Sequence, residues 1–148
     1  MFDIESKNQD EIIIRTKKTS VSINVAEAEI DGGLKIGKIS GPGEFEIGDV
    51  SIRGIGVKER TIYDVEVGGV HIGIIGEVED GLDDLGISDI LCTSSVRAVR
   101  EIEPKVVVAI GNVDGMVTDL KLTARAEKKL KIKNADSLPA SLEVVVLS

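Results

Sequence analysis

The segment Gly41–Ile55 constrains the fold more than any other part of this chain, because it specifies a corner followed directly by a hairpin. Pro42 fixes its own φ, and the glycines on either side of it can adopt the positive φ values that other residues avoid. The pair Gly48-Asp49 then separates two short runs that are typical of β-strands, as in a two-residue turn of the Gly-X kind. The sequence therefore predicts a tight corner that leads into two antiparallel strands.

The apolar residues of the chain are mostly aliphatic, which favours a β-rich core. Hydrophobic residues make up 42% of the 148 residues, whereas aromatic residues make up only 2%. The core must therefore be built from Ile, Val and Leu, and β-branched side chains pack well on the pleated surface of a sheet. This length is usual for one domain, so we expect a single domain spanning residues 1–148.

Turn residues recur at short intervals in the first half of the chain, as expected for a series of hairpins. They lie at Lys17-Lys18, Asp31-Gly32-Gly33, Gly48-Asp49 and Gly68-Gly69. The runs between them alternate apolar and polar residues, for example in Val21–Val25 and Tyr63–Val67. Because alternation with period two gives a strand one buried and one solvated face, this half is predicted to be antiparallel.

The second half contains two nearly continuous apolar runs, Ile87–Thr93 and Val106–Ile110, which are typical of strands buried on both faces. Ser94 or Ser95 can cap a helix between them, and Pro104 ends that helix. The sequence therefore predicts a βαβ unit with two parallel strands.

The end of the chain is predicted to add one more helix and one more strand. Residues 112–118 have the composition of a loop, and Asp119 could cap a helix in which Leu122, Ala126 and Leu130 repeat every four residues. On this reading the basic residues of Arg125–Lys133 form a solvated helix face. The run Leu142–Leu147 is predicted to be the closing strand.

The order of these motifs resembles the small zinc-dependent hydrolases of bacteria and archaea that have the metallo-β-lactamase fold. Gly41–Ile55 is similar to that family's segment PGEYEI-x-G-V-x-I-x-G-I, and Ser137–Leu147 is similar to its closing segment dLPee…vvvL. The resemblance extends from about Ile12 to the C-terminus. It implies an α/β (α+β) sandwich in which an antiparallel hairpin sheet precedes the βαβ unit, and it implies a metal-dependent hydrolase.

The metal ligands of that family are missing from the matching positions. The family begins its di-metal centre with H-x-H-x-D-H, whereas this chain has one histidine, His71, and none in Ala26–Ser40, where that motif would fall. The family's bridging Gly-Asp matches Gly76-Glu77, and its terminal histidine matches Asn112 or the adjacent Gly111. The resemblance therefore implies a reduced, truncated member of the fold that lacks the metal motif.

This ligand loss predicts a protein without a metal, a cofactor or catalytic residues. A catalytic zinc needs about three protein ligands and one open position for water, and one histidine, one cysteine and scattered carboxylates do not supply them. We expect a non-catalytic pseudoenzyme that acts by self-association or by binding a protein or a small ligand. The vestigial pocket is predicted to be lined by Glu77, Asp80 and Asn112.

A metal-dependent hydrolase is the alternative prediction. Glu77 and the acidic run Glu79–Asp84 could hold Mg²⁺, Mn²⁺ or Ca²⁺ through oxygen ligands, with Glu77, Asp80, Asp83 or Asp84 as the candidate ligands. Such a site could also be completed by another subunit. The simpler interpretation of the same run is a solvated acidic loop that leads into a short helix.

Three other candidates for chemistry have simpler interpretations. Glu44 and Glu46 point to one face of a strand and could form an acid/base pair, but a solvated hairpin face also explains them. His71 lies in an alternating strand, where a histidine is usually exposed or hydrogen-bonded. Cys92 has no partner for a disulfide and lies in an apolar run, so a buried thiol is expected.

Charge and hydropathy indicate the partners and the compartment. A net charge of −8 would repel a phosphate backbone, which argues against nucleic acid. The sequence shows neither a secretory signal at Met1–Glu5 nor an apolar run of the roughly 20 residues needed to span a bilayer, so we expect no membrane partner and a cytoplasmic location. Loss of the helix that covers part of the sheet in the family predicts a homo-oligomer, most simply a homodimer.

Overall fold

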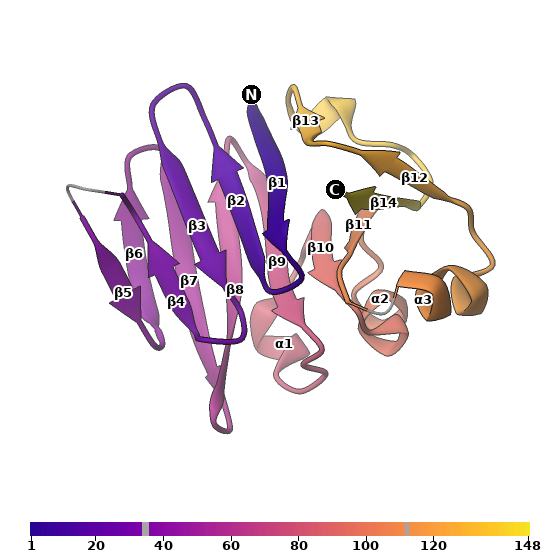
Figure 1. The fold of residues 1–148 in the computed structure, drawn as a ribbon, viewed down its shortest axis with the longest axis horizontal. Coiled ribbons are helices and arrows are strands. Elements are labelled where there is room, and N and C mark those ends of the chain that lie inside the picture. Colours follow the sequence, from indigo (N-terminus) through magenta and orange to yellow (C-terminus); the bar gives the residue numbers. More distant parts are fainter. Residues whose placement is uncertain (34–35, 112) are drawn as a thin grey trace.

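Two stacked sheets form the body of the structure, and the α-helices of the described residues lie along one side of it (Figure 1). The computed structural model of the chain describes residues 1–33, 36–111 and 113–148. Within these residues, one sheet has six strands and the other has eight. The observed elements therefore have the mixed α and β character predicted from the sequence.

The six-stranded sheet is antiparallel and takes the strand order β13-β1-β2-β3-β4-β5 in the described part of the chain. Its strands are β1 (Phe2–Asn8), β2 (Glu11–Arg15), β3 (Ser20–Asn24), β4 (Glu29–Asp31), β5 (Lys38–Ser40) and β13 (Leu130–Ile132).

The eight-stranded sheet takes the order β12-β14-β11-β10-β9-β8-β7-β6 and changes from antiparallel to parallel pairing at β9. Its strands are β6 (Gly43–Ile47), β7 (Val50–Val57), β8 (Arg60–Val67), β9 (Val70–Gly76), β10 (Ile90–Thr93), β11 (Val106–Ala109), β12 (Ala124–Glu127) and β14 (Glu143–Leu147). The predicted hairpin turns at Lys17-Lys18, Asp31-Gly32-Gly33, Gly48-Asp49 and Gly68-Gly69 are confirmed by the pairing of the strands on either side.

The helices are short and cover the parallel part of the eight-stranded sheet (Figure 1). They are α1 (Leu82–Leu85), α2 (Val96–Ile102) and α3 (Val113–Leu120). A separate 3₁₀ turn, η1 (Ala135–Ser137), follows β13 and buries no side chain. No helix in the described part of the chain has the length and apolar character needed to cross a membrane.

Aliphatic side chains fill two layers, one on each face of the eight-stranded sheet. Between the sheets, residues of β1–β4 such as Ile4 and Ile23 pack with Tyr63, Ile74 and Val108 of the larger sheet, and all of these are fully buried. On the other face, strands β9–β11 pack against the helices. Where the helices do not reach, the outer face of β7 and β8 carries polar side chains, so this part of the sheet tolerates water.

The predicted βαβ unit is confirmed. Strands β10 and β11 pair in parallel, and the helix between them begins after Ser95, whose hydroxyl accepts a hydrogen bond from the backbone N–H of Ala98 at 3.1 Å. It ends at Ile102, and the capping residue Glu103, which has a left-handed φ of 55°, is followed by Pro104. One part of the apolar prediction is wrong, because Ile87 is 80% exposed and precedes the buried strand.

The predictions for residues 113–132 are also wrong. The predicted loop contains α3, where buried Met116 packs under the sheet, and the predicted helix beyond Asp119 is replaced by β12 and β13. Lys121, with a φ of 57°, follows the end of α3. A spacing of four residues fits a strand as well as a helix, and pairing of β12 with β14 and of β13 with β1 decides between them.

Replacing Tyr63 by phenylalanine is expected to stabilise the protein. The Tyr63 side chain is fully buried, and its hydroxyl has no hydrogen-bond partner among the described residues. An unpaired buried hydroxyl costs roughly 1–3 kcal/mol, so Tyr63→Phe should raise the free energy of unfolding by about 1 kcal/mol in urea titrations. Ile62→Val, at the adjacent buried position, is the control and should lower it by about 1 kcal/mol. A loss of stability in Tyr63→Phe would reveal a partner for the hydroxyl.

Candidate functional site

The carboxyl ends of β9, β10 and β11 meet at one edge of the large sheet, where a network of hydrogen bonds holds them in place. The hydroxyl of Thr93, which is fully buried, donates to the carbonyl of Gly76 at 2.7 Å and accepts from the N–H of Ser95 at 2.9 Å. The N–H of Ser94 also donates to the Gly76 carbonyl, at 3.0 Å. In open sheets with parallel strands, this edge is where ligands bind.

Gly76 allows the chain to leave β9 sharply. Its φ is 60°, in the left-handed region that favours glycine, and a Cβ atom there would lie 3.2 Å from Cγ2 of Val25. The tight turn places Glu77 at the rim of the edge instead of in the line of the strand, and the Glu77 side chain is 71% exposed. Sequence analysis selected this position, and the structure places it beside a hollow.

The hollow has a volume of about 210 Å³ and lies where the small sheet approaches the strand ends of the large one. Its floor includes the buried side chains of Val25 and Ile110, and its rim is polar. The rim residues are Gln9, Asp10, Arg60, Glu77 and Ser94. Such a hollow can hold a small polar ligand, with an apolar floor and hydrogen-bonding groups around it.

An ion pair crosses the rim. Nη1 of Arg60 lies 2.8 Å from Oε1 of Glu77, and Arg60 comes from the first position of β8, which is antiparallel to β9. Both side chains are well exposed, so the pair contributes little to folding stability. The pair also brings a guanidinium to the rim of the hollow, next to the carboxylate that directly follows β9.

The predicted site residues are only partly brought together. Asp80 lies in a neighbouring hollow that shares Arg60 and Glu77, and its carboxylate lies 3.0 Å from Nζ of Lys58. Asn112 lies outside the described residues, whereas its neighbour Gly111 lines the first hollow. Sequence analysis missed Arg60, and no motif marks it, because its role depends on the pairing of β8 with β9.

The residues at this edge do not fit the zinc centre that the resemblance implies. Within the described part of the chain, no three His, Cys, Asp or Glu side chains lie close enough to hold a metal ion. The carboxylate of Glu79 accepts a hydrogen bond from the Ser95 hydroxyl, and Glu77 and Asp80 are paired with cations. A rebuilt carboxylate centre from Glu77, Asp80, Asp83 and Asp84 is therefore not formed by these residues in one copy.

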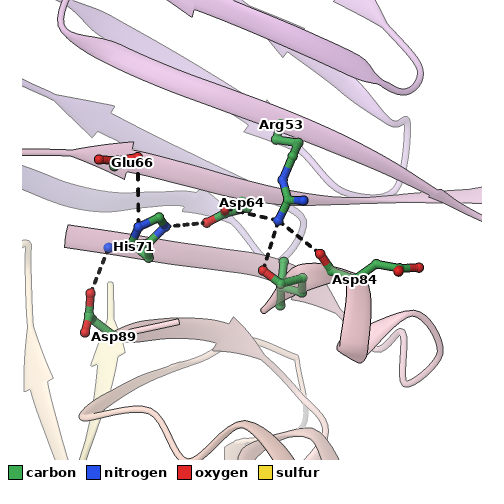
Figure 2. Close-up of polar contacts among 7 residues, drawn as sticks. Arg53, Asp64, Glu66, His71, Asp84 and Asp89 are labelled. Carbon is green, nitrogen blue, oxygen red and sulfur yellow. Dashed lines mark hydrogen bonds and ion pairs between the residues drawn. The ribbon is translucent and has the colours of Figure 1, made fainter. Parts of the chain in front are cut away.

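The single histidine belongs to a different cluster, on the outer face of β7–β9 (Figure 2). Nδ1 of His71 lies 3.2 Å from Oδ1 of Asp64, and the His71 backbone N–H donates to Oδ2 of Asp89 at 2.9 Å. Nη2 of Arg53 lies 3.4 Å from Oδ2 of Asp64.

The same nitrogen of Arg53 donates to the carbonyls of Asp84 and Leu85, at 3.0 and 3.1 Å. The cluster thereby ties α1 to the sheet, and the expectation of a hydrogen-bonded histidine is confirmed.

Cys92 is fully buried between the two sheets, as predicted. Burial raises the pKa of its thiol to about 12, because the thiolate would be desolvated. A nucleophilic cysteine needs the opposite shift, toward a stable thiolate in an accessible position. The Cys92 thiol is therefore a packing group.

A comparison with solved structures identifies the fold. No protein-family model matches the chain, and no curated protein sequence matches it. It is similar in structure to a protein from Thermotoga maritima described as a "putative zn-dependent hydrolase of the metallo-beta-lactamase superfamily". The TM-score is 0.74 and the identity 15%, and the match covers 99% of each chain. The metallo-β-lactamase-like sandwich predicted from the sequence is thus confirmed as the fold.

Cys92 should be unreactive in the folded protein. Because the chain has one cysteine, labelling with Ellman's reagent at neutral pH reports on this thiol alone. We expect slow labelling of the native protein and rapid labelling in guanidinium. Equal rates in both conditions would contradict the burial of Cys92.

The same thiol should also make the fold sensitive to alkali. The folded pKa lies above the ordinary value of 9.0, so the stabilisation is complete below about pH 9 and is lost as pH rises toward 12. In denaturant titrations across this range, Cys92→Ala should lose less stability than the wild-type protein. An equal loss in both proteins would assign the alkaline effect to other groups.

Proposed function

We propose that this protein is a non-catalytic, metal-independent relative of the metallo-β-lactamase-fold hydrolases, and that it acts by binding at the hollow beside Gly76. The Arg60–Glu77 ion pair is the observation that carries the proposal. In the family that the sequence resembles, the residue after this glycine is an aspartate that bridges two metals. Here the matching carboxylate faces a guanidinium at 2.8 Å.

Electrostatics favour this interpretation over a hidden metal site. A divalent cation beside Glu77 would have to displace Arg60 or lie close to its positive charge, and like charges a few ångströms apart repel each other even near a protein surface. A catalytic zinc also needs about three ligands from His, Cys, Asp or Glu, whereas the described rim of the hollow offers two, the carboxylates of Asp10 and Glu77. The hollow is better suited to an organic ligand than to a metal ion.

The chemistry of the rim indicates the class of ligand. Arg60 and the Gln9 amide can donate hydrogen bonds, Asp10 and Glu77 can accept them, and Ser94 can do both. Val25 and Ile110 supply an apolar floor. A small polar molecule with both donors and acceptors, and a short apolar part, would match this arrangement.

The proposal predicts that divalent metals do not stabilise the folded protein. A ligand that binds only the folded state raises the apparent melting temperature by mass action. We expect no such rise with Zn²⁺, Mn²⁺ or Mg²⁺, either in the wild-type protein or in Arg60→Gln, in which Glu77 is released. Lys58→Gln is the matched control, because Lys58 pairs with Asp80 beside the same hollow. A metal-dependent rise that Glu77→Ala abolishes would favour the metal-dependent hydrolase instead.

Binding itself can be located by NMR. A screen of small polar fragments followed by ¹H–¹⁵N spectra should shift the amides of Gly76, Glu77, Ser94 and Gly111 together. The same fragments should shift these amides much less in Arg60→Gln. Hits that shift only amides elsewhere, or no hits, would contradict a ligand site at this edge.

A further inference from the structure

Positive charge is concentrated in one short segment of this acidic chain. Residues 121–133, called here the basic arm, contain six of the 18 Lys and Arg residues but only one of the 26 Asp and Glu residues. The arm includes β12 and β13, which are edge strands of the large and the small sheet respectively. It thus runs past one end of the sandwich and carries a charge opposite to that of the whole molecule.

Most of the charge on the basic arm is not neutralised within one copy. Arg125 lies 3.6 Å from Glu143 and 3.7 Å from Glu127, and Lys129 lies 3.7 Å from Asp3. The other lysines of the arm make no ion pair with any residue that the structure describes. They are Lys121, Lys128, Lys131 and Lys133, and all of them are exposed. A hollow of about 480 Å³ lies along the arm.

The opposite end of the large sheet carries a complementary surface. Glu44 and Glu46 on β6 and Glu66 on β8 are exposed, line one hollow of about 420 Å³, and are called here the acidic face. Within the described chain, Glu44 and Glu46 make no ion pair, and the carboxylate of Glu66 pairs with no lysine or arginine and lies 3.9 Å from Nε2 of His71.

Arg53 also lines this hollow and lies directly across from Glu44 in the pairing of β6 with β7, but it makes no ion pair with the three glutamates of the acidic face. Its guanidinium turns toward Asp64 and the carbonyls of α1, as Figure 2 shows. The carboxylates of Glu44 and Glu46 therefore line the hollow without a cationic partner among the described residues.

One copy of the chain cannot bring these two surfaces together. Strands β6 and β12 are the two opposite edges of the eight-stranded sheet, and they lie at opposite ends of the molecule (Figure 1). We infer that the basic arm of one copy docks on the acidic face of a second copy, head to tail. Because the two surfaces lie at opposite ends of the molecule, the head-to-tail contact is made once between each pair of copies, so it is heterologous and leads to rings or open chains.

The spacing of the charges supports a second copy as the occupant. Glu44 and Glu46 are separated by two residues along a strand, and Lys131 and Lys133 repeat at the same interval along and just beyond β13. Side chains two apart in a strand lie on the same face about 6.6 Å apart, so the two pairs can meet in register. A nucleic acid fits the arm less well, because residues 121–133 include no aromatic side chain on which bases could stack.

Charge reversal on each surface provides the test. Sedimentation velocity should show species larger than a monomer at low ionic strength and their loss in concentrated NaCl, because exposed charges are screened by salt. Lys131→Glu with Lys133→Glu, and separately Glu44→Lys with Glu46→Lys, should each be monomeric at low salt. An equimolar mixture of the two variants should associate again, because each reversed surface then meets a complementary one.

Matched controls make the outcome decisive. Lys17→Glu with Lys18→Glu changes the charge equally at an exposed turn outside both surfaces and should associate like the wild-type protein. If a reversal variant fails to fold by circular dichroism, Lys131→Gln with Lys133→Gln replaces it and should also weaken association. A monomeric wild-type protein at low salt, association that survives either reversal, or a mixture that stays monomeric would each overturn the inference. These residues lie outside the hollow beside Gly76, so failure here leaves the proposed ligand site standing.

Discussion

Burial of the central strands on both faces is the constraint on which the rest of this structure depends. In β10, Leu91 points toward the helices and Cys92 toward the small sheet, and both are fully buried. Val107 and Val108 alternate in the same way in β11. Since parallel strands of this kind need cover on each side, the small sheet and the helices are both required, and their contacts fix where the strands end. The hydrogen bonds of Thr93 then join those ends and shape the edge beside Gly76.

Turns and helix caps could be predicted from the sequence, because they depend on residues close together in the chain. The two-residue turn at Gly48-Asp49 and the cap at Ser95 both lie where their chemistry indicates. Residues 113–132 could not be predicted in this way. Gly115 weakens the helical signal of α3, and the four-residue spacing of Leu122, Ala126 and Leu130 is compatible with either period. The pairing of β12 with β14 and of β13 with β1 makes these residues strands. This pairing joins distant parts of the sequence, so no local pattern could predict it.

In the candidate site too, local signals could be predicted from the sequence and long-range contacts could not. Glu77 could be found from its position after an apolar strand and a glycine, whereas its partner Arg60 is 17 residues away and meets it only through the register of a hairpin. Arg53 was missed for the same reason, because its contacts to α1 depend on tertiary packing. Sequence reasoning therefore located the edge of the sheet that is proposed as the site, but not the Arg60 guanidinium beside Glu77.

A sandwich of this fold can keep its core while the function of its edge changes, because different residues are needed in the core and at the edge. The core requires aliphatic side chains of the right period, and the edge requires only that a few residues occupy the strand ends. The central claim of this account is that the edge beside Gly76 no longer holds a metal. Elemental analysis of untagged protein, purified without chelators, tests it most directly. We predict zinc, manganese and iron far below one atom per chain, whereas a stoichiometric metal retained through dialysis would contradict the account.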